Sequence, residues 1–164
     1  MNKTKDIVLI ALLSSILFIQ EEILTFLPNI QLTIFLLILY SCVLKTKKTV
    51  LIILIHVLLD NLVMGSMNIV FVPFMFLGWS IIPICLNTIF KNVRSSIGLA
   101  YLAIIFALLY SWIYIIPNVL VYGVDPLAYL IADLLFEIIL AISSFLTTLW
   151  LYEPCERVLR YMYK

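Results

Sequence analysis

The stretch IGLAYLAIIFALLYSWIYIIPNVLV, residues 97–121, contains no charged side chain and decides the class of fold. A helix needs about 20 predominantly apolar residues to cross a hydrocarbon layer of about 30 Å, and this stretch meets that requirement. The whole chain has the same character, since 65% of its 164 residues are hydrophobic and 12% are charged. Soluble domains carry about 25% charged residues. We therefore expect an all-α integral membrane protein that forms one transmembrane domain over residues 1–164.

Further apolar runs flank this stretch, and together they predict six transmembrane helices. Backbone amides in lipid must be satisfied within their own segment, so each run is expected to be helical. The predicted spans are Ile7 to Leu27, Ile30 to Leu44, Thr49 to Met64, Ile69 to Phe90, Ile97 to Val121 and Leu127 to Leu151. The second run is short, and the first ends in the polar residues Gln20, Glu21 and Glu22. The second run is therefore open to being a tilted or re-entrant stretch.

All ten Lys and Arg residues fall on one side of the membrane if the six spans alternate in direction. They are Lys3, Lys5, Lys45, Lys47, Lys48, Lys91, Arg94, Arg157, Arg160 and Lys164. Because cytoplasmic loops carry an excess of basic residues, both termini are expected in the cytoplasm, with the chain in the cell membrane. Acidic residues are expected in the outer half or near the midplane: Glu21, Glu22, Asp60, Asp125, Asp133 and Glu137.

Ionisable side chains at membrane depth are functional candidates, because a charge near the centre of a span costs about 2.5 to 3.5 kcal/mol on insertion scales. His56 and Asp60 are four residues apart in the third predicted span. Tyr129, Asp133 and Glu137 repeat this spacing in the sixth. Residues four apart share one helix face. Two interpretations remain open: both rows line a water-accessible cavity, or His56 pairs with Glu137 as a structural bridge.

Aromatic and amide side chains in the fourth and fifth spans add to these candidates. Trp79 precedes Pro83, so a ring is expected at a kink, where it serves either core packing or a pocket wall. Tyr114 and Asn118 flank Pro117 at an expected opened helix end, although an aromatic belt also explains rings at this depth. The predicted solute contacts are Glu22, His56, Asp60, Asn61, Trp79, Tyr114, Asn118, Tyr129, Asp133 and Glu137.

The absence of Lys and Arg from the outer half predicts the charge of the solute. A buried carboxylate or phosphate is commonly bound by Arg or Lys, whereas carboxylates accept hydrogen bonds from amines and ring N–H groups. We expect a neutral or cationic solute, a nitrogen heterocycle stacked on Trp79, Tyr114 or Tyr129. The chain has one histidine and no Gly-x-x-x-x-Gly-Lys-Ser/Thr loop, so we expect no metal, cofactor, nucleic acid or enzymatic activity.

Three short motifs resemble those of the substrate-binding S components of energy-coupling factor (ECF) vitamin importers, which are six-helix proteins with both termini inside. The segment Ala11 to Ser15 is similar to the family's Ala-x-x-x-Ala patch, with Ser15 in place of the second alanine. The segment Leu27 to Thr33 resembles the first outer loop. The pattern Gly123-x-x-Pro126-x-x-Tyr129 is similar to the entry to the last helix in thiamine-type members, where the matching tyrosine contacts substrate.

This resemblance implies an S-component-like bundle that works with partner subunits. The partners are a transmembrane coupling subunit (T component), which docks on Ala11 and Ser15, and two ATPase subunits. Small residues four apart also allow close packing inside one chain. That alternative stays open, because Ala103, Ala107 and Ser111 form a similar row in the fifth span.

The main rival interpretation is a membrane scaffold of the MreD type from the cell-shape machinery. Such proteins have a Leu-Pro start to one helix and an aspartate in another, which match Leu27-Pro28 and Asp60 here. A scaffold does not need ionisable groups at membrane depth, so the solute-binding interpretation is favoured. An intramembrane protease and a nickel or cobalt transporter are less favoured, because a single histidine supplies too few metal ligands.

Overall fold

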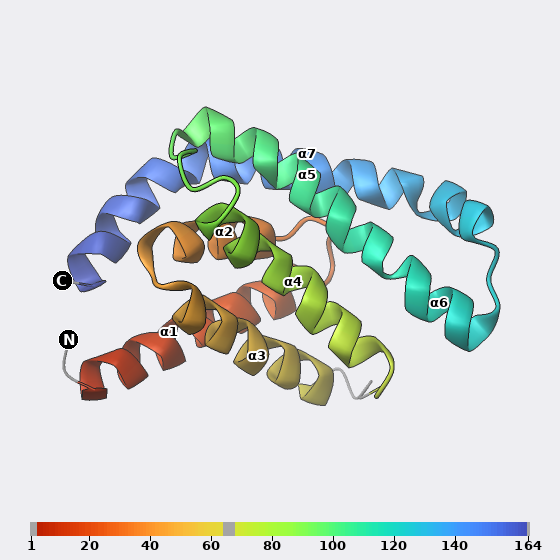
Figure 1. The fold of residues 1–164 in the computed structure, drawn as a ribbon, viewed down its shortest axis with the longest axis horizontal. Coiled ribbons are helices and arrows are strands. Elements are labelled where there is room, and N and C mark those ends of the chain that lie inside the picture. Colours follow the sequence, from red (N-terminus) through yellow and green to blue (C-terminus); the bar gives the residue numbers. More distant parts are fainter. Residues whose placement is uncertain (1–2, 64–67, 164) are drawn as a thin grey trace.

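The computed structural model describes residues 3–63 and 68–163, and all regular structure within them is helical (Figure 1). The helices are α1 (Lys3–Leu24), α2 (Thr33–Val43), α3 (Thr46–Val63), α4 (Phe71–Asn87), α5 (Ser96–Ile113), α6 (Ile115–Tyr122) and α7 (Pro126–Tyr163). The prediction of an all-α chain is confirmed for this part of the sequence. Met64, the predicted end of the third span, and Lys164 lie outside the described residues.

Three described segments are long and apolar enough to cross a membrane: α1, α5 together with α6, and α7. The helices α2 and α4 are apolar but shorter. This composition fits a membrane helical bundle, whereas the number of spans stays a prediction.

Helix α2 lies at the centre of the bundle. Every residue from Thr33 to Ser41 is buried, and α1, α3, α4, α5 and α7 all pack against this helix. Its 11 residues rise about 16 Å at 1.5 Å per residue, about half of the hydrocarbon thickness. Protein therefore encloses this short helix, as a tilted or re-entrant segment requires.

The N-terminus of α2 is capped by a side chain from α1. The N-cap residue, Leu32, makes no side-chain cap of its own. Instead the Leu32 N–H donates to Gln20 Oε1 at 2.9 Å, and Gln20 Nε2 donates to Thr33 Oγ1 at 2.8 Å. Gln20 Nε2 also donates to the Leu17 carbonyl at 3.0 Å, which holds the amide in place. Gln20 thereby satisfies one of the backbone N–H groups that a helix start leaves without an intrahelical partner.

The fifth predicted span is divided into two helices, α5 and α6, at Tyr114. Pro117 has no N–H to donate to the Ile113 carbonyl, so the regular ladder is interrupted one turn before the proline. The Tyr114 N–H donates to the Ser111 carbonyl at 3.1 Å, which tightens the end of α5. The opened helix end that the sequence predicts beside Asn118 therefore lies at Tyr114 instead.

The predicted end of the sixth span, Leu151, is also passed, because α7 continues through Pro154 to Tyr163. Small buried side chains occur on both α5 and α7, Ala103 and Ala107 on the first, Ser144 and Thr148 on the second. Side chains of this size allow the two long helices to approach closely.

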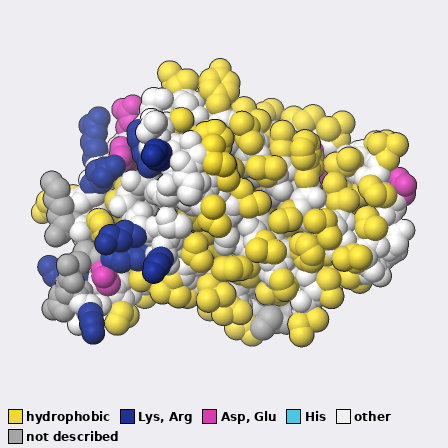
Figure 2. All heavy atoms as spheres, viewed as in Figure 1, with side chains coloured by type: hydrophobic (Ala, Val, Ile, Leu, Met, Phe, Trp, Pro, Cys, Tyr) yellow, Lys and Arg dark blue, Asp and Glu magenta, His cyan; other side chains and the backbone are white. Residues whose placement is uncertain are grey.

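Basic side chains gather at one end of the bundle. They occur at the starts of α1, α3 and α5 and at the end of α7. Figure 1 shows that these helix ends lie together, beside both ends of the chain. Figure 2 shows the Lys and Arg side chains of the visible face concentrated there, with a largely hydrophobic surface over the rest. This segregation is the arrangement from which the cytoplasmic orientation was predicted.

Candidate functional site

Glu21 and His56 form a close contact between two ionisable side chains in the interior. The carboxylate oxygen Oε2 of Glu21, in the last turn of α1, lies 3.0 Å from Nε2 of His56 in α3. The His56 side chain is fully buried, whereas Glu21 retains 20% of its side-chain exposure. His56 therefore pairs with Glu21, and not with Glu137 as one interpretation of the sequence proposed.

This contact is close but poorly aligned. Neither Nδ1 nor Nε2 of His56 has a partner with hydrogen-bond geometry among the described residues, despite the 3.0 Å approach of Glu21. Glu21 Oε2 also receives a long hydrogen bond of 3.4 Å from the Thr33 hydroxyl at the start of α2. The positive end of the α2 dipole thus lies beside the same carboxylate.

Two more carboxylates complete what we call the acid–histidine cluster, formed by Glu21, Glu22, His56 and Asp60. The carboxyl group of Asp60 lies near the other three members. Glu22 Oε1 is buried without a hydrogen-bond partner in the part of the chain that the structure describes. With all four groups ionised, three negative charges face one positive charge.

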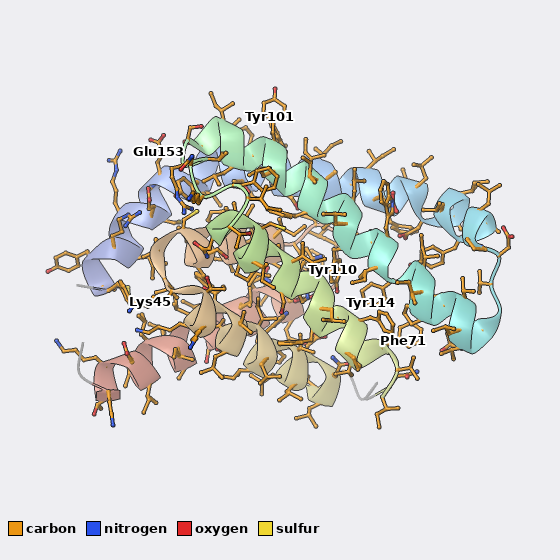
Figure 3. The ribbon with its side chains drawn as sticks, viewed as in Figure 1. Lys45, Phe71, Tyr101, Tyr110, Tyr114 and Glu153 are labelled. Carbon is orange, nitrogen blue, oxygen red and sulfur yellow. The ribbon has the colours of Figure 1, made fainter. Side chains whose placement is uncertain are left out.

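Aromatic rings lie next to this cluster, between α4 and the α5–α6 segment (Figure 3). Trp79 stacks on Tyr110 with ring centroids 3.6 Å apart, and the Tyr110 and Tyr114 hydroxyls are 3.1 Å apart. Glu21 and Asp60 lie close enough to act electrostatically on both hydroxyls. We call Trp79, Tyr110 and Tyr114 the ring stack.

Gly78 makes the ring stack possible. A Cβ atom at this position would lie 2.9 Å from Cδ2 of Tyr110, closer than carbon atoms normally approach. The stacked Trp79 itself is fully buried, and its Nε1 has no hydrogen-bond partner among the described residues. The stack therefore provides a buried N–H group as well as ring surface.

The two predicted amide contacts are engaged within the protein. Asn61 Nδ2 donates to the Val57 carbonyl at 2.8 Å and contacts Met75 Sδ at 3.3 Å. Asn118 Nδ2 donates to the Tyr114 carbonyl at 2.8 Å, which supports the helix break. Both amides hold the local structure in this conformation.

The row on α7 lies apart from the acid–histidine cluster. Asp133 is next to Ser111 and Glu137 is next to Trp112, both on α5. Figure 1 shows α3 and the N-terminal half of α7 on opposite sides of α4 and α5. Tyr129 is the link between the two regions, because it lies near Tyr114 of the ring stack. The structure thus does not bring the two predicted rows into one cavity.

The small residues of α1 and α5 differ in their surroundings. Ala11 and Ser15 are exposed, and the Ser15 hydroxyl donates to the Ala11 carbonyl at 2.9 Å. Ala103 and Ala107 on α5 are buried. The row on α5 is used for packing within the chain, and the row on α1 is not.

Glu21 and Tyr110 were absent from the sequence-based set of solute contacts. A signal for Glu21 was present, because the buried residues Leu9, Leu13 and Leu17 precede it at four-residue spacing. Glu21 continues this row along one face of α1. The sequence contains no comparable signal for Tyr110, because its stacking on Trp79 depends on how closely α4 approaches α5.

Five surface hollows lined by described residues lie elsewhere. The most polar, of about 420 Å³, is at the basic end and is lined by Arg94, Ser96 and Glu153, among others. A mostly apolar hollow of about 340 Å³ lies between α1, α2 and α7. None of these five hollows includes a member of the acid–histidine cluster.

No protein-family model, curated protein or solved structure matches this chain. Within residues 3–63 and 68–163, no three His, Cys, Asp or Glu side chains are arranged to hold a metal ion.

Proposed function

We propose that this chain is the substrate-binding subunit of an ECF-type importer and captures a small neutral or cationic nitrogen heterocycle from outside the cell. One observation carries this proposal: the acid–histidine cluster adjoins the ring stack in the interior, where several helices meet. His56 Nδ1, Glu22 Oε1 and Trp79 Nε1 are left without partners among the described residues. Each such buried polar group costs about 1 to 3 kcal/mol, a cost that a bound solute can remove.

The chemistry of the cluster supports the proposed charge of the solute. Carboxylates accept hydrogen bonds from amines and ring N–H groups, and a flat heterocycle can stack on aromatic rings. The described Lys and Arg side chains lie at the opposite, basic end of the bundle, so an anionic solute would lack a charged partner at the cluster. The row of Tyr129, Asp133 and Glu137 is a second proposed contact surface, reached through Tyr114.

We propose the orientation that the basic end implies, with six spans, both termini in the cytoplasm and the acid–histidine cluster toward the outside. A cysteine at Lys47 should resist an impermeant thiol reagent in sealed cells and react after permeabilisation. A cysteine at Asp125, which is exposed near the opposite end of the bundle, should react in sealed cells. Labelling of the Lys47→Cys protein from outside would reverse the orientation and place the cluster toward the cytoplasm. Both variants are made in a cysteine-free background, because the chain has three cysteines of its own.

Energy for import is proposed to come from a T component and two ATPase subunits. The exposed patch of Ala11 and Ser15 supports docking on α1, since small side chains let another helix approach. Ala11→Trp should abolish co-purification of the coupling subunit and uptake, while a heterocycle found by thermal-shift screening still stabilises the isolated chain. Ile105→Trp is the control, because Ile105 is exposed on α5 and not on the helix that carries the patch.

Two results would refute this proposal. One is a screen of vitamin-like heterocycles in which no compound raises the melting temperature of the purified protein. The other is unchanged uptake by Ala11→Trp cells. The alternative is an MreD-like scaffold, supported by the pairing of His56 with Glu21 inside the chain. It predicts that deletion alters cell shape without reducing the uptake of any solute.

A further inference from the structure

We infer that the acid–histidine cluster binds a small organic monocation, and that each cation entering it displaces the proton carried by His56. This inference rests on the proposed function, because it specifies the charge of the solute and how its binding is regulated. It is drawn from the charges that surround His56, from the geometry of the Glu21–His56 contact and from the rings beside it.

The groups around His56 leave an excess of negative charge. Helix α1 contributes Glu21 and Glu22, and α3 contributes Asp60 one turn beyond His56. Helix α4 has no charged residue between Phe71 and Asn87. In a medium of low dielectric constant an unbalanced charge is costly, so the cluster favours an additional positive charge.

The remaining neighbours supply dipoles and hydroxyl groups. The Thr33 hydroxyl of α2 approaches Glu21, and the Tyr110 and Tyr114 hydroxyls of the ring stack face the same region. The other titratable group buried on α2, Tyr40, donates instead to the Leu13 carbonyl at 3.3 Å, on the side of the basic end. No described Lys or Arg therefore neutralises the cluster.

The geometry of the Glu21–His56 contact allows a bound cation to replace the proton on His56. Its 3.0 Å distance lacks hydrogen-bond alignment, and Nδ1 has no partner among the described residues, so the ring is not held by a strong directional bond. A cation beside Glu21 would repel a protonated imidazole at this distance. The proton leaves the ring for water, and only this N–H bond is broken. The net charge of the cluster is the same before and after the exchange.

The geometry points to a flat cation with N–H donors, such as an amidinium, a guanidinium or a protonated heterocycle. Such a group can donate two parallel hydrogen bonds to one carboxylate of Glu21 or Asp60. The ring stack beside these carboxylates offers aromatic surface, to which a cation is attracted. An inorganic metal ion is a poorer match, because the described residues form no metal-binding group.

The test uses three probes of the same shape and different charge: benzamidinium, benzamide and benzoate. The protein contains one histidine, so in ¹³C,¹⁵N-histidine-labelled protein in lipid nanodiscs the ring signals report His56 alone. Benzamidinium should shift these signals toward the neutral imidazole. Its affinity should rise with pH, by up to about tenfold per pH unit, because one proton leaves for each cation that binds. Benzamide and benzoate should neither shift the His56 ring signals nor bind with an affinity that rises with pH.

Two variants separate His56 from the carboxylates. Glu21→Gln should lose benzamidinium binding by at least about tenfold, whereas Asp125→Asn, an exposed acid outside the cluster, should bind like the parent. His56→Asn should bind the cation with an affinity that no longer rises with pH, because no proton is then displaced. If the affinity of His56→Asn still rises with pH, the pH dependence belongs to the carboxylates, and the proton exchange at His56 is overturned.

Equal binding of benzamide and benzamidinium, or no binding of any probe, would overturn the cation site. The importer proposal is tested by different results from those that test the cation site. If a heterocycle stabilises the protein and is taken up, but binds equally well at low and high pH, the inference fails and the importer proposal stands. If no heterocycle stabilises the protein, the importer proposal fails.

Discussion

Replacing His56 by leucine is expected to lower the free energy of unfolding by about 2 to 3 kcal/mol, because Glu21 then faces an apolar interior without its partner. Removing one member of a fully buried ion pair costs about 3 to 5 kcal/mol. The value expected here is smaller because Glu21 keeps 20% of its side-chain exposure. For a chain of this size the melting temperature should fall by about 5 to 10 °C.

The double variant Glu21→Leu/His56→Leu separates the contribution of the pair to stability from its contribution to solute binding. Hydrophobic replacement of both members of a buried pair is often neutral or stabilising, so its melting temperature should return close to that of the parent. Solute binding should be lost in the double variant, which lacks the Glu21 carboxylate, and kept in His56→Leu, which retains it. A double variant that is no more stable than His56→Leu, or one that still binds the solute, would contradict this account of the pair.

A surface ion pair provides the matched control for this cycle. Arg157 and Glu153 are 3.9 Å apart on α7, and their side chains are 82% and 64% exposed. Exposed pairs contribute at most about 1 kcal/mol. Arg157→Leu should therefore change the melting temperature much less than His56→Leu.

Replacing Gln20 by leucine is expected to cost a similar amount, about 2 to 3 kcal/mol, by uncapping α2. The Leu32 N–H would lose its acceptor at a buried helix start, and a buried donor without a partner costs about 1 to 3 kcal/mol. Thr33 would lose one of its three side-chain contacts but keep Glu21 and Gln31. The loss should therefore be local to the start of α2.

Amide hydrogen exchange measures this uncapping directly. In Gln20→Leu, amides in the first turns of α2 should exchange faster, while those of the α5–α7 pair keep their protection. Asn87→Leu is the control, because Asn87 Nδ2 bonds only to the Pro83 carbonyl of its own helix, at 3.0 Å. Equal melting temperatures for the two variants would exclude the capping role of Gln20.

The positions of the helices could be predicted from the sequence because the rule that was used, helix formation within an apolar run, is local. Each apolar run must satisfy its own backbone, so the runs coincide with α1, α2, α3, α4, the α5–α6 segment and α7. The ends are less predictable. The last apolar run ends at Leu151, but a helix can continue past the apolar run that identifies it, as α7 does to Tyr163.

The candidate site was predictable only along single helices. The four-residue spacing of His56 and Asp60 correctly places them near one another. Which helix faces this row depends on the packing of the whole bundle, and spacing within one helix carries no information about it. For this reason the sequence suggested Glu137 as the partner of His56, whereas α1 provides Glu21.

The half-length helix α2 has a consequence for biogenesis. It is the second described helix along the chain, yet the helices that pack against it include α7, which comes much later in the sequence. A helix that rises only about 16 Å cannot reach across the hydrocarbon layer alone. In synthesis from the N-terminus, α1 and its Gln20 cap are available to α2 at once. The side of α2 that packs against α7 stays uncovered until α7 has been made.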